Sequence, residues 1–202
     1  MAYSDFNLDR VRTAFGLTID TKPMFADAQR VQPQTWLVDH FERIKGMPLN
    51  GEKVRGELLV SPLLIAVRES EGNQLGVFSG SRFDVDPTNG LVGECDFIVG
   101  LVESAYVIRA PVITMVEAKK ADIESGLGQC IAQMIAARSF NIAAGANAPV
   151  FGCVTTGREW QFLKLADAIV ECDRDTRLLV DLPLLLGIFR SIIAEGRAAL
   201  AV

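Results

Sequence analysis

Charged side chains stand where the sequence otherwise predicts a buried β-strand. In the segment VITMVEAKKAD (residues 112–122), an apolar run leads into Glu117 and Lys119 with no turn signal between them. Because side chains alternate between the two faces of a strand, Glu117 and Lys119 would share one face, with their stems about 6.5–7 Å apart. Both head groups would therefore reach one small site at the end of the strand.

Asp96 is a second acid inside an apolar run, in the segment GECDFIVG. It precedes Glu117 by 117 − 96 = 21 residues, which suits two neighbouring antiparallel strands joined by a generous turn. Two carboxylates beside a lysine suit Mg²⁺, which binds oxygen ligands and is commonly held by one or two carboxylates, waters and a substrate phosphate. Without a cation, the two acids would repel each other and raise each other's pKa.

Other common catalytic groups are scarce in this chain. His40 is the single histidine, so histidine metal clusters and Ser–His nucleophile pairs are hard to build. The four cysteines stand far apart and form no C-x-x-C pair, so we expect core residues and neither a zinc site nor a disulfide framework. Chemistry in this protein would have to use carboxylates, lysine and amides, with or without a hard metal ion.

The hydrophobic periodicity predicts one α/β or α+β domain over residues 1–202. The first third is expected to be mainly helical, with helices at residues 5–15, 35–46 and about 50–70. Strands are expected at residues 75–85, 93–104 and 110–120, followed by a long helix that Asp122 would cap. Further strands at residues 150–157, 159–165 and 168–173 would precede a C-terminal helix at about 181–200.

Asp96, the motif Glu117-Ala118-Lys119 and the glutamine-bearing helix after it resemble the PD-(D/E)XK nuclease superfamily, in an uncharacterised branch. Its members share the restriction-endonuclease-like fold, a central mixed sheet flanked by helices. The core order is a helix, three antiparallel strands, a helix and a further strand. The resemblance runs from about Glu57 to Leu165, inside a core of residues 50–170, and leaves residues 1–48 as a helical N-terminal extension.

The resemblance implies a Mg²⁺-dependent nuclease that hydrolyses DNA phosphodiester bonds, with Mn²⁺ able to substitute. Asp96, Glu117 and the backbone carbonyl of Ala118 would bind the metal. Lys119 would be the catalytic lysine. The resemblance also implies two supporting residues, the acid of the first core helix and a helix glutamine: Glu57 and Gln129.

Two positions depart from the superfamily pattern, and simpler interpretations stay open. Cys95 stands where the motif often has a proline, and Gln133 stands where some branches have a tyrosine. Glu117 and Lys119 could form a salt bridge at an exposed strand end, and Glu57 could be an ordinary surface residue. Basic residues that could contact a phosphate backbone are Lys120 and Arg138.

The composition favours a second class of function. The net charge is −5 and the pI is about 5.0, whereas a protein that binds nucleic acid through its overall field is normally basic. The alternative is a non-catalytic nuclease-fold protein that acts as a DNA- or protein-binding accessory or regulatory subunit. With no secretory signal and no run of ~20 apolar residues, we expect a cytoplasmic protein outside the membrane. Whether it forms a homodimer is left open.

Overall fold

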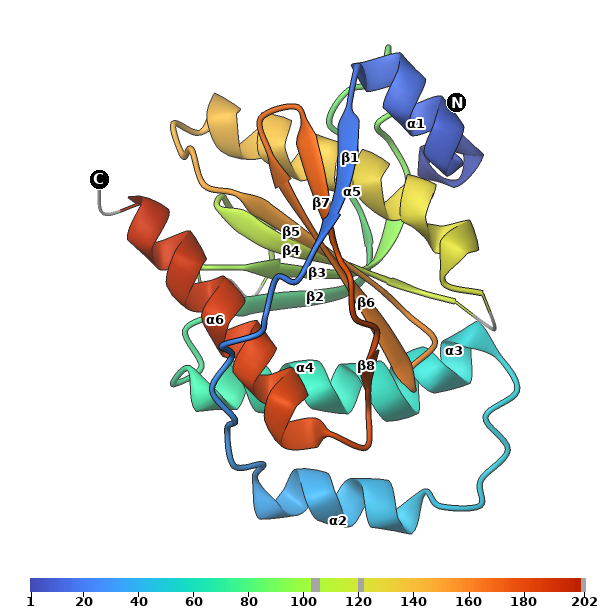
Figure 1. Cartoon of the computed structure of the whole chain (residues 1–202), viewed down its shortest axis with the longest axis vertical. Coiled ribbons are helices and arrows are strands. Elements are labelled where there is room, and N and C mark those ends of the chain that lie inside the picture. The colour runs from blue at the N-terminus through green and yellow to red at the C-terminus, as the bar shows by residue number, and fades with distance from the viewer. Residues whose placement is uncertain (103–105, 120–121, 201–202) are drawn as a thin grey trace.

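A twisted, mixed β-sheet with helices on both faces forms the centre of the protein (Figure 1). The computed structural model describes residues 1–102, 106–119 and 122–200. The mixed α/β architecture predicted from the sequence is confirmed. Within the described residues, no helix combines the length and apolar character needed to cross a membrane.

The described part of the sheet has eight strands in the order β1-β7-β6-β5-β4-β3-β2, with β8 paired to β6. The strands are β1 (Thr18–Lys22), β2 (Gly76–Arg82), β3 (Glu94–Gly100), β4 (Val112–Ala118), β5 (Val150–Thr155), β6 (Glu159–Ala166), β7 (Ile169–Asp173) and β8 (Arg177–Leu178). The β1–β7 and β4–β5 pairs are parallel, and the other pairs are antiparallel. A parallel pair requires a crossover connection, and a long helix supplies it between β4 and β5.

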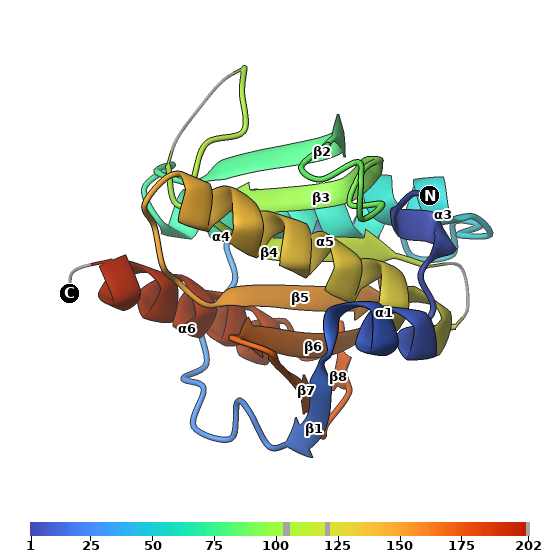
Figure 2. The same ribbon diagram turned by 90° about the horizontal axis from the view of Figure 1, so that it is seen from above.

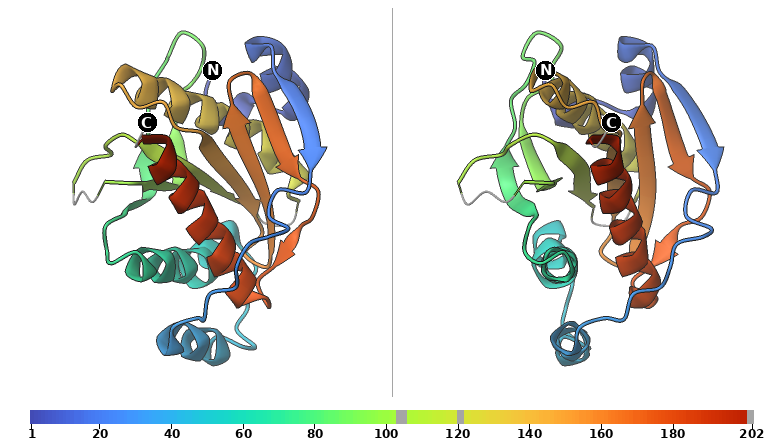
Figure 3. Two further views of the ribbon diagram at one scale, coloured as in Figure 1. Left: turned by 60° about the vertical axis from the view of Figure 1, so that its left-hand side comes forward. Right: turned by 90° about the vertical axis from the view of Figure 1, so that its left-hand side faces the viewer.

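Helices cover the sheet in two groups. The helical segments are η1 (Tyr3–Asp5), α1 (Leu8–Phe15), α2 (Thr35–Arg43), α3 (Glu52–Arg55), the π-helical turn η2 (Gly56–Val60), α4 (Ser61–Ser70), α5 (Glu124–Ala143) and α6 (Leu182–Leu200). The helix α5 packs on β4 and β5 and carries α1 beside it, as Figure 2 shows. On the other face lie α4 and α6, and α2 lies outside α4 (Figure 3).

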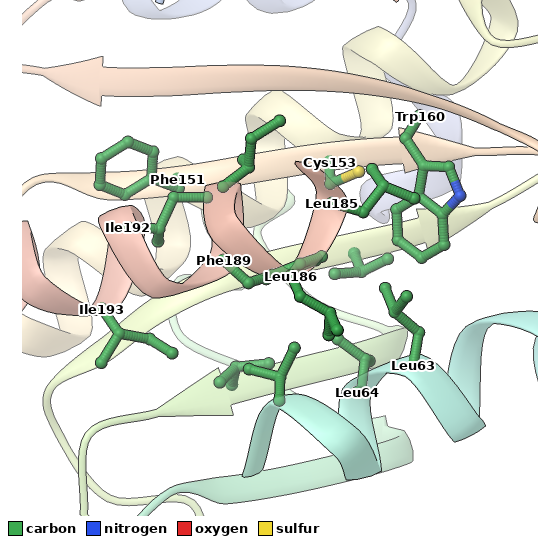
Figure 4. Close-up of a cluster of buried hydrophobic side chains, with 14 of the residues drawn as sticks. Leu63, Leu64, Phe151, Cys153, Trp160, Leu185, Leu186, Phe189, Ile192 and Ile193 are labelled. Carbon is green, nitrogen blue, oxygen red and sulfur yellow. The ribbon is translucent and has the colours of Figure 1, made fainter. Parts of the chain in front are cut away.

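The core between α4, α6 and the sheet is aromatic and aliphatic (Figure 4). The ring of Phe189 from α6 meets Trp160 at a centroid distance of 6.0 Å and Phe162 at 5.6 Å, both edge to face. Leu63 and Leu64 reach the same cluster from α4. This face of the sheet is therefore held by apolar packing.

The strand β4 contributes to two apolar cores, the one under α4 and α6 and a second one under α5. Every residue from Val112 to Ala118 is buried. A strand with neighbours on both sides and helices on both faces normally reads as a continuous apolar run. Thr114 and Glu117 interrupt that run, and both are buried; Glu117 is its only charged residue.

The N-terminal segment differs from the prediction. Residues 1–48 contain α1 and α2, as expected, but also β1, so the prediction of a purely helical extension is wrong. The segment TIDTK is exposed at four of its five positions. A strand that is mostly exposed on both faces shows no alternation of apolar and polar residues, so its sequence carried no strand signal.

Two helix boundaries also differ. The predicted helix at residues 50–70 is interrupted by the π-helical turn Gly56–Val60. The predicted cap residue Asp122 lies one position too early, because Ile123 occupies the N-cap of α5. The Asp122 carboxylate still accepts a hydrogen bond of 2.9 Å from the N–H of Glu124, so it satisfies one of the free donors of that helix end.

Candidate active site at the end of the central strand

The register of β3 and β4 brings Asp96 beside Glu117. Phe97 pairs with Val116, so the next residues along the two antiparallel strands are Asp96 and Glu117. The side chain of Asp96 also takes part in the pairing, because its Oδ2 accepts a hydrogen bond of 2.7 Å from the N–H of Ala118.

Glu117 is a carboxylate inside the core, 2% exposed. Its Oε1 lies 2.9 Å from Nζ of Lys119, and its Oε2 accepts a hydrogen bond of 2.8 Å from Nε2 of Gln133. Burial and the charge of Asp96 raise the pKa of Glu117 to about 7, although the contacts with Lys119 and Gln133 oppose this. Glu117 therefore titrates near neutral pH, whereas the pKa of an exposed glutamate is ~4.3.

Lys119 follows β4 directly, and its side chain is 18% exposed. Its N–H donates to the carbonyl of Thr155 at 2.7 Å, and its Nζ donates to Oε1 of Gln129 at 3.1 Å. Gly126 of α5 makes room for this side chain, because a Cβ at Gly126 would lie 3.0 Å from Cγ of Lys119. Burial lowers the pKa of Lys119, but the hydrogen bond and charge of Glu117 outweigh it and leave the pKa raised.

Asp96 is half-buried and its pKa is also raised. Burial is the main cause, and the charges of Glu52 and Glu94 add to it. The N–H of Ala118 and the charge of Lys119 act in the opposite direction. The site therefore concentrates negative charge beyond what its one lysine offsets.

A cleft of about 600 Å³ opens beside Asp96 and Ala118, between the segment Glu52–Ser61 and strands β2 and β3. The charged residues of its lining are Glu52, Lys53, Glu57, Glu94 and Asp96. Glu57, the predicted acid of the first core helix, is exposed and faces this cleft. Glu52 was not predicted from the sequence, and its charge acts on both Asp96 and Lys119. An acid in the first turn of a helix is common for electrostatic reasons alone, so Glu52 gave no functional signal.

The two glutamines of α5 both reach the ion pair. Gln129, predicted from the resemblance, contacts Lys119, and Gln133 contacts Glu117. The sequence leaves Gln133, four residues after Gln129 on the same helix flank, open between a site residue and a simple polar flank, and the structure places its amide against Glu117. Of the two basic residues considered for phosphate contact, Lys120 lies outside the described residues, and Arg138 pairs with Asp167 at 3.2 Å.

The donor set suits a hard cation. Asp96, Glu117 and the carbonyl of Ala118 offer oxygen only, which Mg²⁺ and Mn²⁺ accept. Among residues 1–102, 106–119 and 122–200, no group of three or more His, Cys, Asp or Glu side chains could hold a metal ion. Mg²⁺ needs only one or two carboxylates when waters complete its shell, and a cation would relieve the repulsion that raises the pKa of Glu117.

Comparison with known proteins adds no relative, because no protein family, curated protein or solved structure matches this chain. A functional proposal has to be built from the sequence motif and from the geometry and charge of the site.

Proposed function

We propose that the protein is a divalent-metal-dependent nuclease that hydrolyses DNA phosphodiester bonds at the Asp96–Glu117–Lys119 site. One observation carries the proposal: two neighbouring strands hold two acids side by side, one of them 2% exposed, with a single lysine. This arrangement weakens the folded state, because burial and like charge both disfavour the ionised forms. Groups whose pKa is strongly perturbed in this way cluster at functional sites.

The metal would be held by Asp96, Glu117 and the carbonyl of Ala118, with Mg²⁺ as the cofactor and Mn²⁺ as a substitute. A bound divalent ion lowers the pKa of a coordinated water and neutralises charge on a phosphate. Asp96 and Glu117 contribute the negative charge that attracts the ion. Glu52 and Glu57, on the cleft wall, add to the same field.

Lys119 is suited to act as a cation and a hydrogen-bond donor. Its raised pKa keeps the ammonium protonated at neutral pH, so it can donate to a phosphate oxygen or orient the attacking water. Gln129 accepts a hydrogen bond from Nζ at 3.1 Å and so restricts the rotamers available to the lysine. The lysine is therefore held in place before any substrate arrives.

The test is cleavage of supercoiled plasmid and of single-stranded DNA by the purified protein, with Mg²⁺, with Mn²⁺ and with a chelator. We expect metal-dependent cleavage that Glu117→Ala and Lys119→Ala each reduce by about a thousandfold or more. Lys45→Ala is the matched control, because Lys45 is exposed and pairs with Glu42 on α2. Equal cleavage by wild type and Lys119→Ala would contradict the catalytic assignment.

Two observations argue against cleavage and so favour a second candidate, a nuclease-fold subunit that binds DNA or protein without cleaving DNA. Its described charged lining has four carboxylates and one ammonium, which repels a polyanion unless cations intervene. Both oxygens of Glu117 already have a hydrogen-bonded or ion-paired partner. Retention of labelled DNA without any cleavage, unchanged in Glu117→Ala, would support this candidate and exclude the nuclease.

A further inference from the structure

Gln133 is a polar side chain in an apolar part of α5. It is 0% exposed, and its neighbours Ala132 and Met134 are buried as well. Its Nε2 donates to Glu117, while its Oε1 has no hydrogen-bond partner among the described residues. A buried acceptor left unpaired costs about 1–3 kcal/mol. The amide of Gln133 therefore makes a single hydrogen bond among the described residues, and that bond goes to Glu117.

The contact fixes the Glu117 carboxylate from a second direction. An ionised carboxylate only accepts hydrogen bonds, so the amide nitrogen of Gln133 faces Glu117 in that state. Lys119 holds Oε1 from the end of the same strand, and Gln133 holds Oε2 from the helix above it. With one donor on each oxygen, rotation of the carboxylate breaks at least one contact.

The spacing of the two glutamines matches the spacing of the ion pair. The four-residue spacing from Gln129 to Gln133 corresponds to about 6 Å along the helix axis. The two-residue spacing from Glu117 to Lys119 corresponds to about 6.5–7 Å along the strand. Each glutamine can therefore serve one member of the pair, and the structure shows one hydrogen bond to each.

We propose that Gln133 is a positioning residue that orients the Glu117 carboxylate for a divalent cation and so sets the affinity of the site for that cation. This inference rests on the proposed function. Partners that orient metal-binding carboxylates and imidazoles typically change metal affinity or activity by about 10–100-fold when they are removed. Gln133 acts through Glu117 and does not need to touch the metal or the DNA.

The experiment measures Mn²⁺ binding by the electron paramagnetic resonance signal of the free ion, on the full chain without DNA. Wild type is compared with Gln133→Met and Gln133→Leu, which keep the bulk and remove the donor. Met134→Leu is the matched control, because Met134 is the next residue of α5 and is also 0% exposed. Thermal unfolding without metal identifies any variant that fails to fold, and the other Gln133 variant then carries the comparison.

We expect the Kd for Mn²⁺ to rise about tenfold in the Gln133 variants and to stay at the wild-type value in Met134→Leu. DNA cleavage by the Gln133 variants should recover when Mn²⁺ is raised to saturation. Wild-type affinity in a folded Gln133 variant would overturn the inference and leave the proposed nuclease intact. Absence of Mn²⁺ binding by wild type would overturn the nuclease itself, and this inference with it.

Discussion

Asp173 and Glu117 are both buried carboxylates in ion pairs, but their surroundings differ. Asp173 accepts hydrogen bonds from the N–H of Met24 at 3.1 Å and from Nη2 of Arg177 at 2.9 Å, and it ties the end of β7 to the segment after β1. Glu117 has one lysine and one amide, and it stands beside Asp96.

The contrast separates a carboxylate that stabilises the fold from one that the fold tolerates. Backbone N–H groups and an arginine satisfy Asp173, and the nearby acid, Asp175, is half exposed, with a side-chain exposure of 51%. At Glu117 a second, half-buried acid raises the pKa to about 7. A buried salt bridge is thus no guide to function until the neighbouring charges are counted.

The largest change in stability is expected at the buried pair of Asp173 and Arg177. Arg177→Met leaves Asp173 buried with its charge unpaired, so we expect a loss of about 3–5 kcal/mol in the free energy of unfolding. Urea denaturation measures it. Arg174→Met is the control, because Arg174 is 64% exposed and should cost little. A loss below 1 kcal/mol for Arg177→Met would erase the distinction between the two pairs.

The pH dependence of stability should follow Glu117. Its folded pKa of about 7 exceeds the unfolded value near 4.3, so its stabilising contribution is complete below about pH 4 and is lost as the pH rises through 7. Glu117→Gln removes the titration. With a chelator present, we compare the free energies of unfolding of Glu117→Gln and wild type. As the pH is raised from 4 to 8.5, we expect this difference to shift in favour of Glu117→Gln by on the order of 2–3 kcal/mol.

Urea denaturation of wild type and Glu117→Gln at the two pH values provides the measurement. Glu124→Gln serves as the control, since Glu124 is an exposed acid in the first turn of α5. The expectation is contradicted if the difference between wild type and Glu117→Gln is the same at both pH values.

A smaller change in stability is expected when a larger residue at position 126 crowds the side chain of Lys119. In Gly126→Ala the new Cβ would lie 2.6 Å from Cγ1 of Val154 and 3.0 Å from Cγ of Lys119, so both have to move. We expect a loss of about 1–2 kcal/mol in stability. DNA cleavage should fall about tenfold, because the Lys119 ammonium is displaced. Gly56→Ala is the control for stability, since its Cβ would meet Phe97 at an ordinary 3.7 Å.

The smallest change in stability is expected at an exposed ion pair, which gives the reference value for the buried pairs. The exposed pair of Lys45 and Glu42 has side-chain exposures of 70% and 60%. Lys45→Ala should change the free energy of unfolding by no more than about 0.5 kcal/mol and should leave the pH dependence unchanged. Chemical denaturation at low and at high salt measures this change. A change comparable to that of Arg177→Met would show that burial does not set the scale here.

The placement of Asp96, Glu117 and Lys119 near one another could be predicted because its signal in the sequence is local. Asp96 and Glu117 are acids inside apolar strands, and a strand period of two puts Lys119 beside Glu117. The pairing of β3 with β4 was indicated by the separation of 21 residues from Asp96 to Glu117, which suits neighbouring antiparallel strands joined by a generous turn. The order of elements from α4 to β5 could be predicted for the same reason, since each strand and the helix α5 has a clear apolar pattern.

The rest depends on contacts that sequence spacing does not specify. The packing of α5 on the sheet decides which flank of the helix faces β4. The sequence therefore could not tell whether Gln133 points toward Glu117 or toward solvent. Glu52 approaches Asp96 through the fold of the segment before β2. The strand β1 pairs with a strand near the other end of the chain, and its exposed residues gave no pattern to detect.

That pairing has a consequence for the order in which the chain is built. Thr18 of β1 pairs with Ile169 of β7, 169 − 18 = 151 residues later. At synthesis rates of roughly 5–20 residues per second, β1 emerges on the order of 10–30 s before its partner exists. The first strand made is therefore among the last to enter the sheet, and the nascent protein has to carry it unpaired until the sheet is nearly complete.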